Sequence, residues 1–422
     1  MSDQEITAPD AEEVDQRHPL QIADFRAFWL ARLFGVLATS AQGAAVAWQA
    51  YDLVKNQTHD ISKAAFYMGL IGLGQFITLF CLTVPAGIVA DRVDRKQIYR
   101  VVSGLSVLLS LAFLAYSYVQ HPPFWGFLVL SSLLGAMRAF SAPASAAIGP
   151  MLVPKYVLPK AIAINAMAFQ TGIIVGPVLG GLLIALSPHF AFMACAVIAS
   201  LSCLMLFFIK TDTRPEPPTT TRLAMIKEGL VYIWEKKIIF GAISLDLAAV
   251  LLGGVTALLP VFARDILHAG PLGFGLLRSS VGVGALSMSF WLSFRPLRRH
   301  AGGWMFGGVA VFGICTIIFG LSNLFWLSFI SMVILGAADM ISVYVRGTLV
   351  QIVTPDHMRG RVSSVSYLFI GASNELGEFE SGVVARFLGP IGSVLFGGIG
   401  SILVTGAWIK LFPDLYKADR LE

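Results

Sequence analysis

The chain has 422 residues, of which 56% are hydrophobic and only 13% are charged, and its mean hydropathy is +0.75. Soluble domains carry about 25% charged residues, so this composition excludes a soluble protein of this length. It predicts a polytopic α-helical membrane protein, and a β-barrel is disfavoured because the apolar runs are long and continuous. The net charge of +5 is attributed to basic loops on one membrane face and does not indicate nucleic acid.

The first 25 residues are polar and acidic and lack both the basic start and the apolar core of a signal peptide. We expect a disordered cytoplasmic tail there. The apolar segments that follow predict twelve helices, each long enough for a hydrocarbon core of about 30 Å. They cover residues 26–54, 64–90, 97–119, 124–150, 160–186, 189–209, 237–266, 272–294, 303–321, 324–352, 361–387 and 390–411.

Basic residues are distributed unequally between alternate loops. With the amino terminus in the cytoplasm, the inner loops and tails hold 22 Lys and Arg residues and the outer loops hold four. The positive-inside rule therefore places both termini in the cytoplasm of a cell (inner) membrane. A polar, proline-rich linker at 210–221 precedes a segment with helical spacing of apolar residues, which predicts an amphipathic helix on the cytoplasmic interface.

The two halves of the chain repeat each other at an offset of 201 residues. The Leu-Gly-Ala sequence at 134–136 recurs at 335–337, and Gly176 corresponds to Gly377. Two similar bundles suit a transporter that alternates between inward-open and outward-open states around a central site. The predicted organisation is a tail (1–25), a six-helix bundle (26–209), a linker with the amphipathic helix (210–236), a second six-helix bundle (237–411) and a tail (412–422).

A dense charge cluster lies between the second and third predicted helices, in a short loop at the water interface. Its motif residues are Gly87, Asp91, Arg92, Arg95 and Lys96. The pattern G-x-x-x-D-R-x-x-R-K resembles the signature of the major facilitator superfamily of transporters at the same place in the chain. The resemblance implies an all-α fold with twelve transmembrane helices in two pseudo-symmetric bundles. It also implies a latch at the cytoplasmic gate, with Asp91 facing the start of the eleventh helix; the alternative is that these charges only set topology.

The fifth predicted helix carries a second motif, formed by Gly172, Gly176, Pro177, Gly180 and Gly181. Glycines four residues apart allow close helix packing, and a proline removes a backbone hydrogen bond, so together they predict a bendable gate. The pattern G-x-x-x-G-P-x-x-G-G resembles the antiporter motif of drug-proton exporters and therefore favours export. Ordinary glycine packing is the alternative.

Three carboxylates lie in the middle of the eleventh predicted helix, where a charge costs several kcal/mol. They are Glu375, Glu378 and Glu380. Glu375 and Glu378 share a helix face, which suits uptake and release of protons, whereas Glu380 points elsewhere. The structural alternative is that one or two of them pair with a membrane arginine such as Arg346. Arg278 is expected to snorkel to an interface.

Arg138 and Asp339 are related by the repeat offset and therefore lie at similar depth in the fourth and tenth predicted helices. In the superfamily these helices line the central cavity, so the resemblance implies that both side chains face it, where they can face each other. They are candidates for substrate contact or proton release, or for a fixed ion pair. Asp246 is a further proton-coupling candidate, and Trp48 and Tyr344 are candidates for stacking on a ligand.

The sequence contains no soluble catalytic motif, phosphate-binding loop or metal-ligand spacing, so we expect no enzyme activity, catalytic residue, cofactor or metal. Residues 24–32, the Asp246 helix and residues 374–377 resemble the bacterial enterobactin-exporter-like and drug efflux branch. The main hypothesis is proton-coupled export of a small amphipathic organic molecule, siderophore-like or drug-like. Two alternatives stay open: proton symport of a sugar or organic acid, and a receptor or scaffold without transport. The expected partners are a small-molecule substrate, protons and the lipid bilayer, with no nucleic acid, and we expect a monomer.

Overall fold

The computed structural model of the chain describes residues 18–215, 222–297 and 299–417, and within these residues the fold is helical. The predicted tail at 1–17, the linker residues 216–221 and the end of the chain from 418 lie outside the described residues. The helices of the first half are α1 (Ala23–Thr58), α2 (Ile61–Ala90), α3 (Arg95–Ser117), α4 (Phe124–Met151), α5 (Leu158–Leu186) and α6 (Pro188–Phe207).

The second half follows a short helix, α7 (Arg222–Glu235), which lies where the amphipathic helix was predicted. Its long helices are α8 (Lys237–Leu252), α10 (Gly270–Phe294), α11 (Ala301–Leu321), α12 (Phe325–Val353) and α13 (Asp356–Leu411). Four short elements complete the described chain: η1 (Pro19–Gln21), η2 (Val255–Leu258), α9 (Leu259–Val261) and α14 (Pro413–Tyr416), with a π-helical turn, η3 (Phe262–Ile266), after α9.

Ten segments of the described chain are long and apolar enough to cross a membrane. One of them, Met358–Leu411, contains two helices, because Gly389 adopts a left-handed φ of 73° directly before Pro390 and the chain reverses there. The 25-residue helix α10 supplies a further span-length helix packed between α5 and α12. The prediction of a polytopic all-α membrane protein is therefore confirmed, and these helices correspond to the twelve predicted spans.

The seventh predicted span covers 237–266, but it is not the continuous helix that was expected. Helix α8 ends at Leu252, and the chain continues through η2, α9 and the π-helical turn η3. Gly254 lies against the backbone of Gly377 in α13, so that any Cβ there would meet that backbone. Irregular backbone is tolerated at membrane depth where protein buries it, and this break brings Thr256 to α13.

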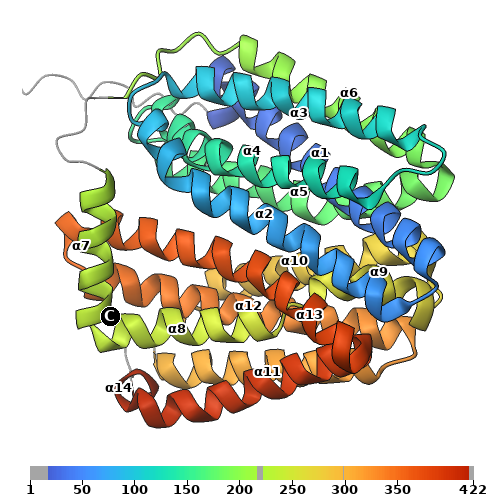
Figure 1. Cartoon of the computed structure of the whole chain (residues 1–422). Coiled ribbons are helices and arrows are strands. Elements are labelled where there is room, and N and C mark those ends of the chain that lie inside the picture. Colours follow the sequence, from blue (N-terminus) through green and yellow to red (C-terminus); the bar gives the residue numbers. More distant parts are fainter. Residues whose placement is uncertain (1–17, 216–221, 298, 418–422) are drawn as a thin grey trace, which may run out of the picture.

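The two halves form two groups of helices that face each other (Figure 1). Contact between them runs along two pairs, α2 with α13 and α5 with α10. At Gly69 and Gly382 the backbones of α2 and α13 nearly touch, since a Cβ on Gly69 would lie 2.9 Å from the Cα of Gly382. The halves also repeat structurally, because α4 begins at Phe124 and α12 at Phe325, 201 positions later.

Helix α7, the start of α1 and the described carboxyl end lie at one end of the molecule (Figure 1). We call this the α7 end and the opposite one the far end. Order extends further into both predicted tails than expected. His18 caps η1 by accepting from the amide of Leu20, Phe25 is fully buried, and Leu415 of α14 is buried against the second half.

The glycine face of α5 gives a test of the packing. A Cβ on Gly180 would lie 3.1 Å from the Cα of Ala41 in α1, so Gly180→Val is expected to lower the free energy of unfolding by about 1–3 kcal/mol through overpacking. Thermal unfolding of the purified protein in detergent measures this. Gly104→Val is the matched control, because no atom lies within 4 Å of a Cβ at Gly104. Equal unfolding temperatures for the two variants would contradict the close approach of α1 and α5.

Candidate functional site

An ion pair crosses between the two halves in the middle of the spans. Nη1 of Arg138 in α4 donates to Oε1 of Glu375 in α13. The Glu375 side chain is 6% exposed whereas that of Arg138 is 53% exposed, so the carboxylate is enclosed and the guanidinium borders open space. The prediction that Arg138 could pair with Asp339 is therefore wrong. Its partner comes from α13, because α4 approaches the opposite half there.

Glu378 lies one helical turn from Glu375, on the same face of α13. The Thr256 hydroxyl donates to Glu378 Oε1 over 3.2 Å. The break after α8 therefore places a hydrogen-bond donor beside this carboxylate. Gly72 of α2 lies directly over this face, since a Cβ there would come within 2.8 Å of the Glu378 Cβ. The three elements α2, η2 and α13 therefore enclose one carboxylate beside the cross-half ion pair.

Arg278 of α10 is partly buried and faces the first half, since its Nη2 would lie 4.0 Å from a Cβ on Gly43 of α1. That Arg278 snorkels to an interface stays a prediction. Glu380 has a separate environment, in which its carboxylate accepts from the Ser381 hydroxyl over 3.3 Å.

A second polar cluster lies inside the second half. Arg346 of α12 donates to Asp246 of α8, and the Ser342 hydroxyl also donates to Asp246, over 3.1 Å. Both members of the ion pair are about 95% buried, with exposures of 4% for Asp246 and 5% for Arg346. Asp339 and Asp246 line one small cavity of about 10 Å³. The alternative that a glutamate of the eleventh span pairs with a membrane arginine is confirmed for Glu375, but the partner is Arg138 and not Arg346, which pairs with Asp246.

The far end carries a polar network that the sequence did not predict. Asp265 of η3 accepts from the Tyr51 hydroxyl and from Lys55 Nζ of α1, the latter over 2.8 Å. Arg264 of η3 donates to Asp52 and, over 3.2 Å, to Asn56. We call these six residues the far-end clasp, because they join α1 of the first half to η3 of the second half.

A third cross-half contact at the same end joins Asp60, which caps α2, to Arg386 of α13 over 3.6 Å. Lys55, Arg264 and Arg386 are three of the four basic residues that the sequence places in outer loops. The scarcity of basic residues in the outer loops was the sequence signal that could have pointed to these contacts. Where positive charge is avoided, a basic residue that is present points to a specific partner.

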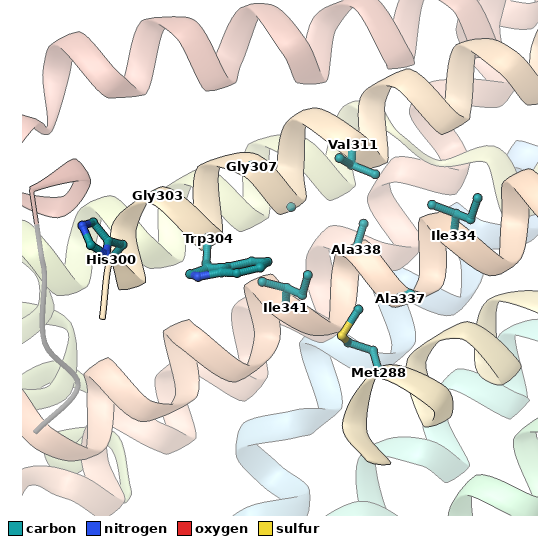
Figure 2. A pocket seen from close by; sticks show the side chains of 11 residues that line it. Met288, His300, Gly303, Trp304, Gly307, Val311, Ile334, Ala337, Ala338 and Ile341 are labelled. Atoms are coloured by element: carbon teal, nitrogen blue, oxygen red, sulfur yellow. The ribbon is translucent and has the colours of Figure 1, made fainter. Parts of the chain in front are cut away.

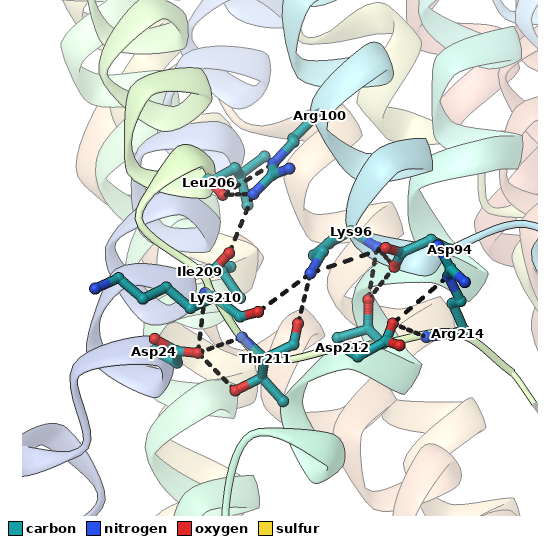
Figure 3. Close-up of polar contacts among 11 residues, drawn as sticks. Asp24, Asp94, Lys96, Arg100, Leu206, Ile209, Lys210, Thr211, Asp212 and Arg214 are labelled. Carbon is teal, nitrogen blue, oxygen red and sulfur yellow. Dashed lines mark hydrogen bonds and ion pairs between the residues drawn. The ribbon is translucent and has the colours of Figure 1, made fainter.

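Lys96 of the 87–96 motif, together with Asp94 and Arg100 beside it, joins elements of the first half. Lys96 Nζ donates to the carbonyl of Thr211 over 2.7 Å, and Asp94 accepts from the Thr213 hydroxyl (Figure 3). Arg100 donates to the carbonyls of Leu206 and Ile209. These contacts fasten the start of α3 to the end of α6 and the chain beyond it.

The other residues of the 87–96 motif have different environments. Gly87 is buried in α2, Arg92 is exposed, and Arg95 Nη1 donates to the Met151 sulfur of α4 over 3.2 Å. These contacts also stay within the first half. That Asp91 faces the start of the eleventh span stays a prediction.

The glycine motif of α5 has two packing faces. Gly172, Gly176 and Gly180 contact α1 within the first half, with Gly176 close to Ser40 and Ala41. Gly181 and the carbonyl of Pro177 contact α10 of the second half at Gly275. The backbone of α5 therefore lies close to α1 in its own half and to α10 in the other half, with glycines at both contacts. Such packing is compatible with the bendable gate that the motif predicts.

The two aromatic candidates lie in different places. Trp48 of α1 packs on Phe274 of α10, with ring centroids 5.9 Å apart, so it belongs to the contact between the halves. Tyr344 of α12 packs against an apolar cluster inside the second half. The structure therefore brings neither ring to the Arg138–Glu375 pair.

Comparison with known proteins identifies the family. Residues 16–422 match the sequence profile of the family described as transmembrane secretion effector. The chain belongs to this family. It is thereby a secondary transporter of the major facilitator superfamily and not an enzyme, as predicted from the motif at 87–96.

Curated relatives of this chain include enterobactin exporters. The enterobactin exporter EntS of Citrobacter koseri (strain ATCC BAA-895 / CDC 4225-83 / SGSC4696) is 24% identical over 405 residues, covering 93% of this chain and 92% of that protein. EntS of Escherichia coli O81 (strain ED1a) is 22% identical over 404 residues, with coverage of 93% and 92%. The relationship is distant but extends over nearly both full lengths.

Solved structures show the same fold at low sequence identity. A D-xylose-proton symporter matches with a TM-score of 0.71 and 16% identity, covering 93% of this chain and 98% of that one. An inward-facing, unoccupied bacterial homologue of the human lysosomal transporter Spinster matches with a TM-score of 0.67 and 15% identity, covering 95% and 97%. The fold of this chain is therefore that of the superfamily.

The buried Arg346–Asp246 pair can be tested by removing one partner and then both. Arg346→Met removes the basic partner of buried Asp246 and is expected to destabilise the protein by about 3–5 kcal/mol, as measured by thermal unfolding in detergent. Adding Asp246→Leu is expected to recover most of that loss, because no uncompensated charge then remains.

Arg361→Met is the matched control, since its pair with Glu228 is more exposed, at 27% and 48%, and is expected to contribute only about 0–1 kcal/mol. A double variant no more stable than Arg346→Met alone would show that the pair is not the source of the effect.

Proposed function

We propose that this protein is a proton-coupled antiporter that exports a small amphipathic organic molecule, siderophore-like or drug-like, by alternating access. In this proposal the α7 end faces the cytoplasm of a bacterial inner membrane and the far end faces outside. The inner loops then hold 22 basic residues and the outer loops four, as the positive-inside rule requires.

The observation that carries the proposal is the Arg138–Glu375 pair with Glu378 beside it. This pair joins the halves where a charge is costly, so its strength depends on whether the carboxylate is ionised. A proton on Glu375 removes the attraction for Arg138, and a proton on Glu378 removes a second negative charge from the same face. Protonation therefore weakens the contact between α4 and α13 and favours separation of the halves.

The cycle follows from that coupling. The arrangement described here has the far end joined by the clasp and by Asp60–Arg386, so cargo reaches the interior from the α7 end. Separation of the halves at the far end releases the cargo outside and admits a proton to the carboxylates. Return to the closed far end re-forms the Arg138–Glu375 pair and discharges the proton inside. Protons thus move inward as cargo moves outward.

The direction of transport has two supports. The curated relatives are exporters, and α5 carries the glycine and proline pattern that resembles the antiporter motif. Likeness to a sugar-proton symporter concerns the fold alone and does not favour uptake. Because similar carboxylate chemistry also serves symport, the direction of flux relative to an imposed pH gradient distinguishes the two.

Neutralising the enclosed carboxylate tests the coupling. A compound-panel efflux assay in a strain without its own exporters first identifies a transported compound. In proteoliposomes with an imposed pH gradient, Glu378→Gln is expected to abolish proton-driven transport of that compound while folded protein is retained. Asp339→Asn, in the second cluster, is expected to have the same effect.

Glu235→Gln is the matched control, because Glu235 is exposed on α7 and is expected to transport at the wild-type rate. Transport at that rate in Glu378→Gln and Asp339→Asn would remove both residues from the proton pathway. Proton-driven accumulation in the opposite direction would replace export with symport.

Cross-linking tests the movement of the halves. With the four native cysteines replaced by serine, the pair Asp52→Cys and Arg264→Cys is expected to be bridged by a short, reducible bifunctional thiol reagent, and the bridge is expected to arrest transport until a reductant is added, because it locks the clasp. Asp24→Cys with Thr211→Cys is the control, since both positions lie in the first half and are in contact. A locked clasp that still permits full transport would contradict opening of the far end.

A further inference from the structure

A groove lies on the second half between α10, α11 and α12, away from the cross-half ion pair. Its volume is about 410 Å³. Figure 2 shows Met288 of α10, Trp304 and Val311 of α11, and Ala338 and Ile341 of α12 around this space. We call it the α11 groove.

The length of the α11 groove matches one leaflet of a membrane. Its lining residues on α11 extend from His300, at the start of the helix, to Val311. Eleven residues of α-helix rise by about 16 Å. Half of a hydrocarbon core is about 15 Å thick, so the groove runs from the α7-side interface to the middle of the bilayer.

Two glycines of α11, Gly303 and Gly307, leave the groove open, although no close helix contact requires a glycine at either position. No atom lies within 4 Å of a Cβ placed on Gly307, and the nearest to one on Gly303 is the His300 Cβ at 3.9 Å. Gly308 differs, since its Cβ would lie 2.9 Å from the Ala338 carbonyl oxygen, so Gly308 sets the approach of α11 to α12. A larger side chain would fit at 303 or 307, and its absence leaves the groove free.

The chemistry of the groove changes along its length. Its walls are apolar along α11 and α12, whereas its α7 end is formed by His300. The loop that leads to His300 carries two exposed arginines, Arg295 and Arg299. The chain has no Asp or Glu between Asp265 and Asp339, so α10, α11 and this loop carry no acidic side chain, and Asp414 is the acidic residue of α14, which packs against the start of α11.

We propose that the α11 groove binds an acyl chain of an anionic phospholipid from the leaflet on the α7 side, whose headgroup phosphate contacts Arg295, Arg299 and His300. An apolar channel of leaflet depth fits one acyl chain. A basic interface at its mouth selects an anionic headgroup, because basic pockets between membrane helices bind such headgroups. The site lies in one half and does not depend on the direction of transport or on proton coupling.

Filling the groove tests the acyl-chain site. Purified full-length protein in detergent is incubated with 1-palmitoyl-2-oleoyl phosphatidylglycerol or with the phosphatidylcholine of the same chains, and retained lipid is counted by native mass spectrometry. Gly307→Leu is expected to lose retained phosphatidylglycerol. Gly406→Leu, on α13 near the same membrane interface and also with no atom within 4 Å of its Cβ, is expected to retain it as wild type does. Equal retention by both variants would overturn the proposal.

Removing the basic mouth tests the headgroup. Arg295→Gln with Arg299→Gln is expected to reduce retention of phosphatidylglycerol to the level of phosphatidylcholine. Lys410→Gln, an exposed basic residue at the end of α13, is expected to leave the preference unchanged. Inorganic phosphate is expected not to displace the lipid, because the acyl chain supplies part of the binding. An unchanged preference without the arginines, or displacement by phosphate alone, would contradict an anionic phospholipid site.

Discussion

The pairing of Arg138 with Glu375 is the interaction on which the rest of the proposed mechanism depends. A guanidinium and a carboxylate that face each other across two helix bundles offset the cost of placing either charge in a membrane. The pair is strong only while Glu375 is ionised and α4 approaches α13. One contact therefore responds both to protonation and to the relative position of the halves, which is the property that coupled transport needs.

Backbone packing allows these charges to meet and to part. Gly72 covers the Glu378 face, Gly69 meets Gly382, and Gly181 meets Gly275, so α2 and α5 lie against the second half with few intervening side chains. Glycines let the helix backbones approach closely. The clasp and Asp60–Arg386 then supply the directional contacts that hold the far end closed.

Polar contacts within each half differ from those that join the halves. Lys96, Asp94 and Arg100 connect α3 to the end of α6, and Arg346 connects α12 to α8. These contacts lie within one half. Arg138–Glu375, the far-end clasp and Asp60–Arg386 cross between the halves, as do the hydrogen bonds from Gln170 to the Gly282 carbonyl and from Ser279 to the Ile174 carbonyl. In the proposed cycle, contacts of this second kind are the ones that a rocking motion changes.

The sequence by itself determined the fold class, the number of spans, the repeat and the family, because hydropathy, breakers and the motif at 87–96 are local patterns. It also identified Arg138, Glu375 and Glu378 as charged residues inside membrane spans, where a charge is costly unless it is paired or functional. It did not determine their partners. A helix turns its side chains through a full circle every 3.6 residues, so the depth of a charge can be counted along the chain, but the helix that it faces cannot. Only the tertiary structure decided that Arg138 meets Glu375, that Asp246 meets Arg346, and that η3 closes the far end onto α1.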